Sequence, residues 1–379
     1  MPIFPDCQQS QTDSCRHVRH VRRWLLYVAF PLAVAALSGC ETCGYYKQAI
    51  QGQYSILTRR QPLDELIAAP QTPVALKEKF QLVLRLHEFA EQELKLPANG
   101  HYLRYVDLNR RYVVWNVHAA PEFSLKPKTW WYPVVGSLKY RGYFSETDAL
   151  RYGARMEKSG WDVYVEGVEA YSTLGWFRDP VLSTFIHHEE AELAEILFHE
   201  LAHQRLFVAG DTDFNEAFAT AVGEEGVRRW LRVRGADANC QKYLAGLERQ
   251  DQFVRLMMSA RRQLESLYGA QKSGLVTATP EETTEQRRRK ALVIEETRIA
   301  YTRLKAEWGG YTGYDYWFAQ SLNNAQLNTV ATYYHLAPAF QRLLQVNDGN
   351  LEKFYGAVRE LSKLPKKERL RRLGLFLAK

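Results

Sequence analysis

Apolar residues recur every three or four positions in two stretches of the N-terminal half, and this spacing predicts amphipathic helices. The first helix covers residues 77–96 and ends before Pro97, which cannot continue a helix. The second starts after the capping residue Ser145, runs through Met156 and stops at Gly160. A region with a different pattern separates the two.

That region, and the stretch after Gly160, is rich in Tyr, Val and Trp, which favour β-strands. Strands are predicted at residues 102–118, 129–144 and 161–171. After residue 213 the pattern is helical throughout. The later helices are predicted at residues 237–269, 281–308, 314–345, 348–361 and 366–377, and the first two of these are expected to form a hairpin. The sequence therefore predicts an α+β fold that is mainly helical.

Residues near position 200 combine a helical pattern with candidate metal chemistry. His199, Glu200 and His203 form the pattern H-E-x-x-H. Residues four apart share one face of a helix, so two imidazoles placed this way can bind one Zn²⁺ ion. Glu200 is predicted to be the general base that takes a proton from a bound water. The helix is expected to be largely buried, because apolar residues recur around the motif at Leu193, Ile196, Leu197, Leu201, Phe207 and Val208.

A second helix, capped by Asp213, is predicted to supply the third metal ligand, Glu216. A zinc hydrolase needs three protein ligands and one open position. Small residues such as Gly223 would let the two helices approach closely. Glu224, two turns further on, is the substitute ligand if Glu216 points away. Asn215 and Glu224 are also candidates for contacting the ligands or the substrate.

The alternative for this region is a helical hairpin whose His and Glu side chains face solvent. We favour the metal site, because buried helices rarely carry unpaired His and Glu on their apolar side. His187 and His188, beside Glu189 and Glu190, suggest either a second metal site or the solvated start of the first helix.

The two motifs, His199–His203 and Asn215–Ala219, resemble the gluzincin metallopeptidases, whose third ligand is a Glu in an N-E-x-F-A-type helix. The spacing between the motifs is shorter here than in the large zinc aminopeptidases. A group of bacterial lipoproteins described as predicted aminopeptidases is similar along most of residues 40–345. The shared stretches are a lipobox Cys, Gly44–Ala49, Pro133–Phe144, the two helices and Asn323–Phe340. This resemblance implies a zinc aminopeptidase with a gluzincin-like catalytic core.

The resemblance extends to residues that would contact a substrate. Residues 130–144 are similar to the gluzincin edge strand, to which a peptide substrate could add by backbone hydrogen bonds. Gly136 would permit a close backbone approach there, and Arg141 is a candidate for binding a substrate carboxylate. The alternative is an ordinary amphipathic strand with an exposed Arg. Tyr333 lies at the family-like T-Y position and is the favoured donor to the oxyanion, ahead of Tyr334 and His335.

The N-terminus predicts the location of the protein. A basic stretch precedes the apolar residues 24–36, which are too few for a comfortable transmembrane span and typical of a signal peptide. Leu37–Cys40 then resembles a bacterial lipobox, so residues 1–39 are predicted to be removed and Cys40 to carry a lipid anchor. Glu41 does not provide the Asp of an inner-membrane retention signal, and the expected location is the outer membrane, facing the periplasm. The alternative is an uncleaved N-terminal anchor.

The cysteines and the net charge add little to the predicted fold and function. A disulfide between Cys43 and Cys240 and two separate thiols are about equally expected. The formal net charge of +7 is spread along the chain, and no nucleic-acid-binding module is recognisable, so no nucleic-acid partner is predicted.

The resulting hypothesis is a lipid-anchored zinc peptidase of the cell envelope, most simply an aminopeptidase acting on a peptide substrate. Its domains would be residues 40–235, with the β-sheet region and the metal-binding helices, and residues 236–379, a helical region packing on the active site. The alternatives are an envelope scaffold with a structural or vestigial zinc site and an endopeptidase of envelope proteins.

Overall fold

The computed structural model describes residues 41–133, 135–173, 177–269 and 279–377. The chain divides into two units, one ending at Ser55 and the other spanning Ile56–Lys379. The described part of the first unit lies within helix α2 (Glu41–Thr58). The predicted signal peptide and Cys40 lie outside the described residues. Within the described part, no helix is long and apolar enough to cross a membrane.

Among its described residues, the second unit contains two three-stranded sheets and a hairpin. One sheet has the order β1 (Gln61–Pro62), β2 (Arg104–Val106) and β8 (Val181–Leu182). The central sheet is antiparallel, with β3 (Val114–Pro121) between β6 (Arg141–Tyr143) and β7 (Trp161–Val168). The hairpin is formed by β4 (Trp130–Tyr132) and β5 (Gly136–Leu138). Short strands thus surround one longer β3–β7 pair.

Two predicted strands are wrong as continuous elements. The strand predicted at residues 102–118 divides into β2 and β3, because Asn109 adopts a positive φ and its N–H donates to the Asp107 carboxylate in a turn. The strand predicted at residues 129–144 divides into β4, β5 and β6. Pro133 interrupts it by removing a backbone donor, and Gly136 adopts a φ of 77°. The strand predicted at 161–171 is confirmed as β7, three residues shorter.

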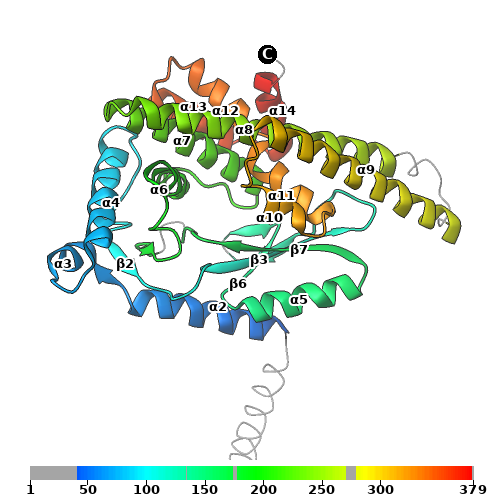
Figure 1. Ribbon diagram of the computed structural model, residues 1–379, viewed down its shortest axis with the longest axis horizontal. Helices are drawn as coiled ribbons and strands as arrows, with labels where there is room; N and C mark the ends of the chain where they lie inside the picture. Colours follow the sequence, from blue (N-terminus) through cyan, green and yellow to red (C-terminus); the bar gives the residue numbers. More distant parts are fainter. Residues whose placement is uncertain (1–40, 134, 174–176, 270–278, 378–379) are drawn as a thin grey trace, which may run out of the picture. The chain divides into compact units, whose positions relative to one another are not determined.

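The two faces of the central sheet carry different side chains. Val163 and Val165 face helix α5 (Glu146–Lys158), since a Cβ added at Gly153 of that helix would lie 3.3 and 3.2 Å from their side chains. Alternation along the strand therefore puts Tyr164 and Glu166 on the opposite face. Helix α11 (Asn324–Tyr334) packs on that face, and Figure 1 shows β3 and β7 between α5 and α11.

The predicted helices are confirmed with shifts at their ends, except the one predicted at residues 314–345. The predicted helix at 77–96 is α4, which begins after Pro73, and the long hairpin is confirmed by the packing of α8 on α9 (Figure 1). The stretch 314–345 is not one helix but three, because Asn323 caps a new helix and Pro338 opens another. The helices not yet bounded are α3 (Leu63–Ala68), α4 (Val74–Gln92), α6 (Glu190–Arg205), α7 (Thr212–Val233), α8 (Asp237–Gly269), α9 (Pro280–Glu307), α10 (Asp315–Ala319), α12 (Ala337–Gln345), α13 (Leu351–Ser362) and α14 (Lys366–Leu377).

The fold is α+β and mainly helical, as predicted, and its apolar side chains form two clusters. The larger cluster includes Phe198 of α6 and Phe214 and Phe218 of α7, all of them fully buried. The smaller cluster joins α8, α9, α10 and α11. Helices α6 and α7 are therefore held inside the main core rather than at the surface.

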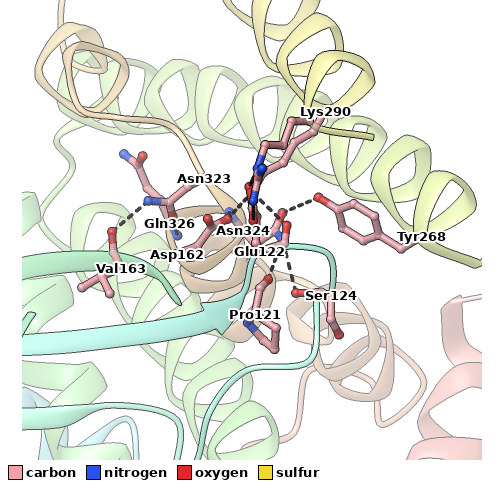
Figure 2. Close-up of polar contacts among 11 residues, drawn as sticks. Pro121, Glu122, Ser124, Asp162, Val163, Tyr268, Lys290, Asn323, Asn324 and Gln326 are labelled. Carbon is pink, nitrogen blue, oxygen red and sulfur yellow. Dashed lines mark hydrogen bonds and ion pairs between the residues drawn. The ribbon is translucent and has the colours of Figure 1, made fainter. Parts of the chain in front are cut away.

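Helix α11 is fixed at its start by one buried side chain, that of Asn324 (Figure 2). Its Nδ2 donates to the carbonyl oxygens of Pro121 and Glu122, at 3.0 and 2.9 Å, where β3 ends. Its N–H donates to Asp162 of β7 at 2.9 Å, and its Oδ1 accepts from Tyr268 of α8 at 3.0 Å. Asn324 thus joins the two central strands to α8 and sets the position of α11.

Candidate metal centre

Helices α6 and α7 lie side by side, and the backbones approach closely at Gly223. A Cβ added to Gly223 would lie 3.2 Å from the backbone oxygen of Glu195 and 3.5 Å from the Cβ of His199. The small residue predicted from the sequence is therefore required at this point. The cap of α7 differs from the prediction: it is Asp211, while the carboxylate of Asp213 forms an ion pair with Lys139.

His199, His203 and Glu216 come together in one group that could hold a metal ion, as predicted. The Oε2 atom of Glu216 lies 3.3 Å from Nε2 of His199 and 3.7 Å from Nε2 of His203. The ligand atoms of the three residues all lie within 4.8 Å of one another. Glu216 therefore points toward the imidazoles, and no substitute from Glu224 is needed.

The electrostatics of Glu216 suit a ligand. Burial by itself would raise the pKa of this carboxyl, but the charges and hydrogen bonds of His203 and His199 hold it well below its ordinary value. The carboxylate therefore stays ionised throughout the neutral range. An ionised carboxylate and two imidazoles are ligands that divalent metal ions prefer.

Glu200 is buried beside this group and behaves differently from Glu216. Burial raises its pKa from 4.5 to about 7, His199 opposes the rise, and the charge of Glu216 adds to it. Because Glu200 follows His199 directly on the helix, its side chain points away from the face that His199 and His203 share. The structure thus keeps this carboxylate beside the group but off the face that His199 and His203 share, in a low-dielectric surrounding.

Tyr333 lies close to the same group, at the end of α11. Burial raises the pKa of its phenol well above the ordinary value, and the carboxylates of Glu216 and Glu200 raise it further. Such coupling requires proximity, because the interaction between charges falls with distance. Tyr334 is surrounded differently: it lines a cavity of about 290 Å³ together with Glu224, Gln341 and side chains of α8. His335 is exposed.

Asn215 and Gly136 both hold the loop between α6 and α7. The side-chain amide of Asn215 is buried, accepts a hydrogen bond from the N–H of Val208 at 2.8 Å and donates to its carbonyl oxygen at 2.9 Å. A Cβ on Gly136 would lie 3.0 Å from the backbone nitrogen of Gly210. The N–H of Gly210 also donates to the carbonyl oxygen of Val135 at 3.1 Å. The close approach at Gly136 is therefore to the chain's own loop.

Within the described residues, Glu224 and Arg141 are not part of the group formed by His199, His203 and Glu216. The carboxylate of Glu224 is buried and accepts a hydrogen bond from Nε2 of Gln341 at 2.5 Å. The guanidinium of Arg141 lies 5.0 Å from the ring centre of Tyr152 of α5. Arg141 pairs with Val117, so it belongs to the face of the central sheet that α5 covers. Neither residue joins the metal group.

Other side chains singled out in the sequence have partners of their own. Nε2 of His188 lies 2.5 Å from Glu169 and its Nδ1 lies 3.1 Å from Glu192. Within the described residues, the group of His199, His203 and Glu216 is the one cluster with metal-ligand geometry. Cys43 belongs to the first unit and Cys240 to the second, so the disulfide and the two separate thiols both stay open as expectations.

One acidic side chain near the group was missed in the sequence. Glu166 faces α11 from β7, its Oε2 lies 3.4 Å from Nε2 of His118, and its charge also raises the pKa of Tyr333. No motif marks this residue. The available signal was alternation: Asp162, Tyr164 and Glu166 place polar atoms on one face of a strand whose other face is apolar.

Fold and site together define a mainly helical α+β protein with a candidate metal centre on two packed helices. A family model described as "Putative aminopeptidase" matches residues 44–373, and the chain belongs to this family. Membership supports a peptidase as the general class of activity. Neither the curated proteins nor the solved structures gave a significant match.

Proposed function

We propose that this protein is a zinc-dependent peptidase of the bacterial cell envelope, acting as an aminopeptidase. The observation that carries the proposal is the convergence of His199, His203 and Glu216 beside the buried carboxylate of Glu200. A purely structural metal site has no need of a buried general base next to its ligands. This favours a catalytic site over a scaffold with a structural or vestigial metal.

The three ligand residues fit a zinc ion. With metal–ligand bonds of about 2.1 Å, neighbouring ligand atoms of a tetrahedral zinc site lie about 3.4 Å apart. The separations from Glu216 to His199 and to His203 are 3.3 and 3.7 Å. One carboxylate and two imidazoles leave a fourth position for water or substrate, which is the arrangement of catalytic rather than structural zinc sites. This ligand set is also the gluzincin set.

Two side chains of this protein carry out the remaining steps of the proposed reaction. When bound, zinc would polarise the scissile carbonyl and lower the pKa of a water. Glu200 accepts the proton of the attacking water and passes it to the leaving amine, which a carboxyl with a pKa of about 7 does well near neutrality. Tyr333 remains a phenol at neutral pH, because its pKa is raised, and donates a hydrogen bond to the developing oxyanion.

An aminopeptidase also needs an acidic group for the α-ammonium of its substrate. Glu166 is the candidate for this role, since its charge and that of Glu216 act on the same phenol, Tyr333. It also lies on the sheet face that α11 covers, opposite the apolar face toward α5. An ionised carboxylate at this place would favour peptides with a free N-terminus over internal peptide bonds.

The location remains a proposal from the sequence. Lipid attachment at Cys40 would hold the enzyme at the outer membrane with its peptide substrates in the periplasm. In the full chain, Cys40→Ala should block lipid attachment and leave a larger precursor. Processing and fractionation of this variant like the wild type would contradict the lipid anchor.

The proposed function is tested by metal content together with turnover. The purified chain should hold one zinc ion and hydrolyse aminoacyl anilides, and chelation should remove both properties until zinc is restored. His199→Ala, His203→Ala and Glu216→Ala should each lose the ion. Glu224→Ala is the matched control, a buried Glu on the same helix, and should retain it. A chain with no stoichiometric metal and no hydrolysis would refute the proposal.

A further inference from the structure

The loop that leads into the ligand Glu216 contains a buried carboxylate, that of Asp211. Asp211 is 1% exposed and precedes helix α7 as its capping residue. Its side chain makes no hydrogen bond to the first turn of that helix. Instead, Oδ1 lies 2.9 Å from Nζ of Lys366 and Oδ2 lies 2.9 Å from Nη2 of Arg369. Both partners come from the C-terminal helix α14.

Of these two partners, Arg369 is the buried one. Its side chain is 5% exposed, whereas that of Lys366 is 47% exposed. Nη1 of Arg369 donates to the carbonyl oxygen of Ser362 at 2.9 Å, and its Cζ lies 4.9 Å from the ring centre of Phe214 in the first turn of α7. A buried pair of charges is screened little, and removal of one partner leaves the other uncompensated. Arg369 therefore constrains Asp211 far more than Lys366 does.

The position of Asp211 is passed on to the ligand through the first turn of α7. The N–H of Asn215 donates to the carbonyl oxygen of Asp211 at 3.1 Å, and Glu216 is the next residue. The ring of Phe214, which Arg369 contacts, also packs edge-on against Phe340 of α12, with ring centres 5.1 Å apart. A shift of Asp211 would thus move the turn that carries the Glu216 carboxylate.

We propose that Arg369 is a positioning residue of the metal centre, which fixes Asp211 and through it the place of Glu216 opposite His199 and His203. The inference rests on the proposed metal site, and it makes the C-terminal helix part of that site although the helix contains no ligand. Residues about 150 positions apart in the sequence are coupled in this way, and no motif in the sequence marks the pair.

The test compares zinc affinity among variants of the full chain purified in detergent. Arg369→Met removes the charge and keeps much of the volume, and it should weaken zinc binding roughly 10-fold, the lower end of the loss seen when a group bonded directly to a ligand is removed. Arg369→Lys keeps a charge and should restore most of the affinity. The readout is competition with a chromophoric chelator, with the folded fraction followed by circular dichroism.

Two controls separate positioning from general stability. Leu373→Ala truncates a fully buried side chain on the same helix, so it should lower the melting temperature and leave zinc affinity unchanged within about threefold. Lys366→Met removes the exposed partner and should have little effect. If Arg369→Met does not fold, Asp211→Asn removes the charge of the other partner of the ion pair and keeps the shape of its side chain. The same loss of zinc affinity is then expected.

The outcomes distinguish this inference from the proposed function. Wild-type zinc affinity in Arg369→Met or Asp211→Asn would overturn the positioning role and leave the metal site intact. An equal loss of affinity in Leu373→Ala would also overturn it, because the helix would then act only through its packing. A wild-type chain without stoichiometric zinc would refute the proposed function and the positioning role together.

Discussion

The Glu216 carboxylate lies 3.3 Å from Nε2 of His199, although the two residues come from different helices. Gly223 makes this contact possible, since a larger residue would meet the backbone of α6 at Glu195. Burial of the helix pair inside the main apolar cluster then keeps the two side chains in place. The metal group is therefore a consequence of helix packing, and the side chains around it can be tested one at a time.

Tyr333→Phe should lower kcat by about 10- to 100-fold and change KM little, because a donor to the oxyanion acts mainly in the transition state. Steady-state kinetics with an aminoacyl anilide measures both constants. Tyr334→Phe is the matched control, since Tyr334 itself lines the cavity beside Glu224. Unchanged kinetics in Tyr333→Phe would remove this residue from the mechanism.

Glu166→Gln should raise KM about 10-fold for substrates with a free α-amino group, because an ion pair with the α-ammonium becomes a weaker neutral contact. N-acetylated substrates should be unaffected by the change. Glu169→Gln provides a control on the same segment, since Glu169 is engaged with His188. Equal losses for free and acetylated substrates would show that Glu166 does not recognise the amine.

Glu224→Gln should increase stability at alkaline pH. Burial raises the folded-state pKa of Glu224 from 4.5 to about 7, and the charge of Glu195 adds to the effect. An acid with a raised folded-state pKa stabilises the fold fully below its unfolded pKa, and this contribution is lost as the pH rises through about 7. The shift corresponds to roughly 3 kcal/mol.

Urea unfolding of wild type and Glu224→Gln measures this effect. The two proteins should have equal free energies of unfolding near pH 4 and should diverge progressively between about pH 4.5 and about pH 7, above which the variant should stay the more stable by a constant amount. Glu225→Gln is the control on the same helix, since Glu225 is paired with Arg229 nearer the surface. If the free energies of unfolding of wild type and Glu224→Gln changed with pH in parallel across this range, the raised pKa of the buried Glu224 carboxyl would be contradicted.

The sequence predicts the parts of this molecule that depend on local pattern. Helices such as α8 and the placement of His199 and His203 side by side follow from periodicity, and these predictions are confirmed. The single strand predicted at residues 129–144 is wrong. That prediction rests on the content of Tyr, Val and Trp, which does not reveal the turns at Pro133 and Gly136. The helix predicted at residues 314–345 is interrupted at Asn323, whose side chain caps a new helix, and the apolar pattern on both sides does not indicate this interruption.

The rest of the site depends on contacts between distant segments. The charge of Glu166 acts on Tyr333 because α11, held at its start by Asn324, packs on the central sheet. Arg141 also illustrates this, since one position in strand register decides that it faces α5 rather than α11. Such relationships follow from the packing of whole elements, which a single sequence does not reveal.

Glu200→Gln tests the account most directly, because it separates metal binding from catalysis. The variant should keep one zinc ion per chain and its folded structure, since Glu200 is not a ligand, and lose hydrolysis by on the order of 10²-fold or more. Glu192→Gln, an exposed change on the same helix, should keep both properties. The decisive measurement is kcat/KM for an aminoacyl anilide at equal zinc occupancy. Near wild-type hydrolysis by zinc-loaded Glu200→Gln would contradict the proposed peptidase mechanism.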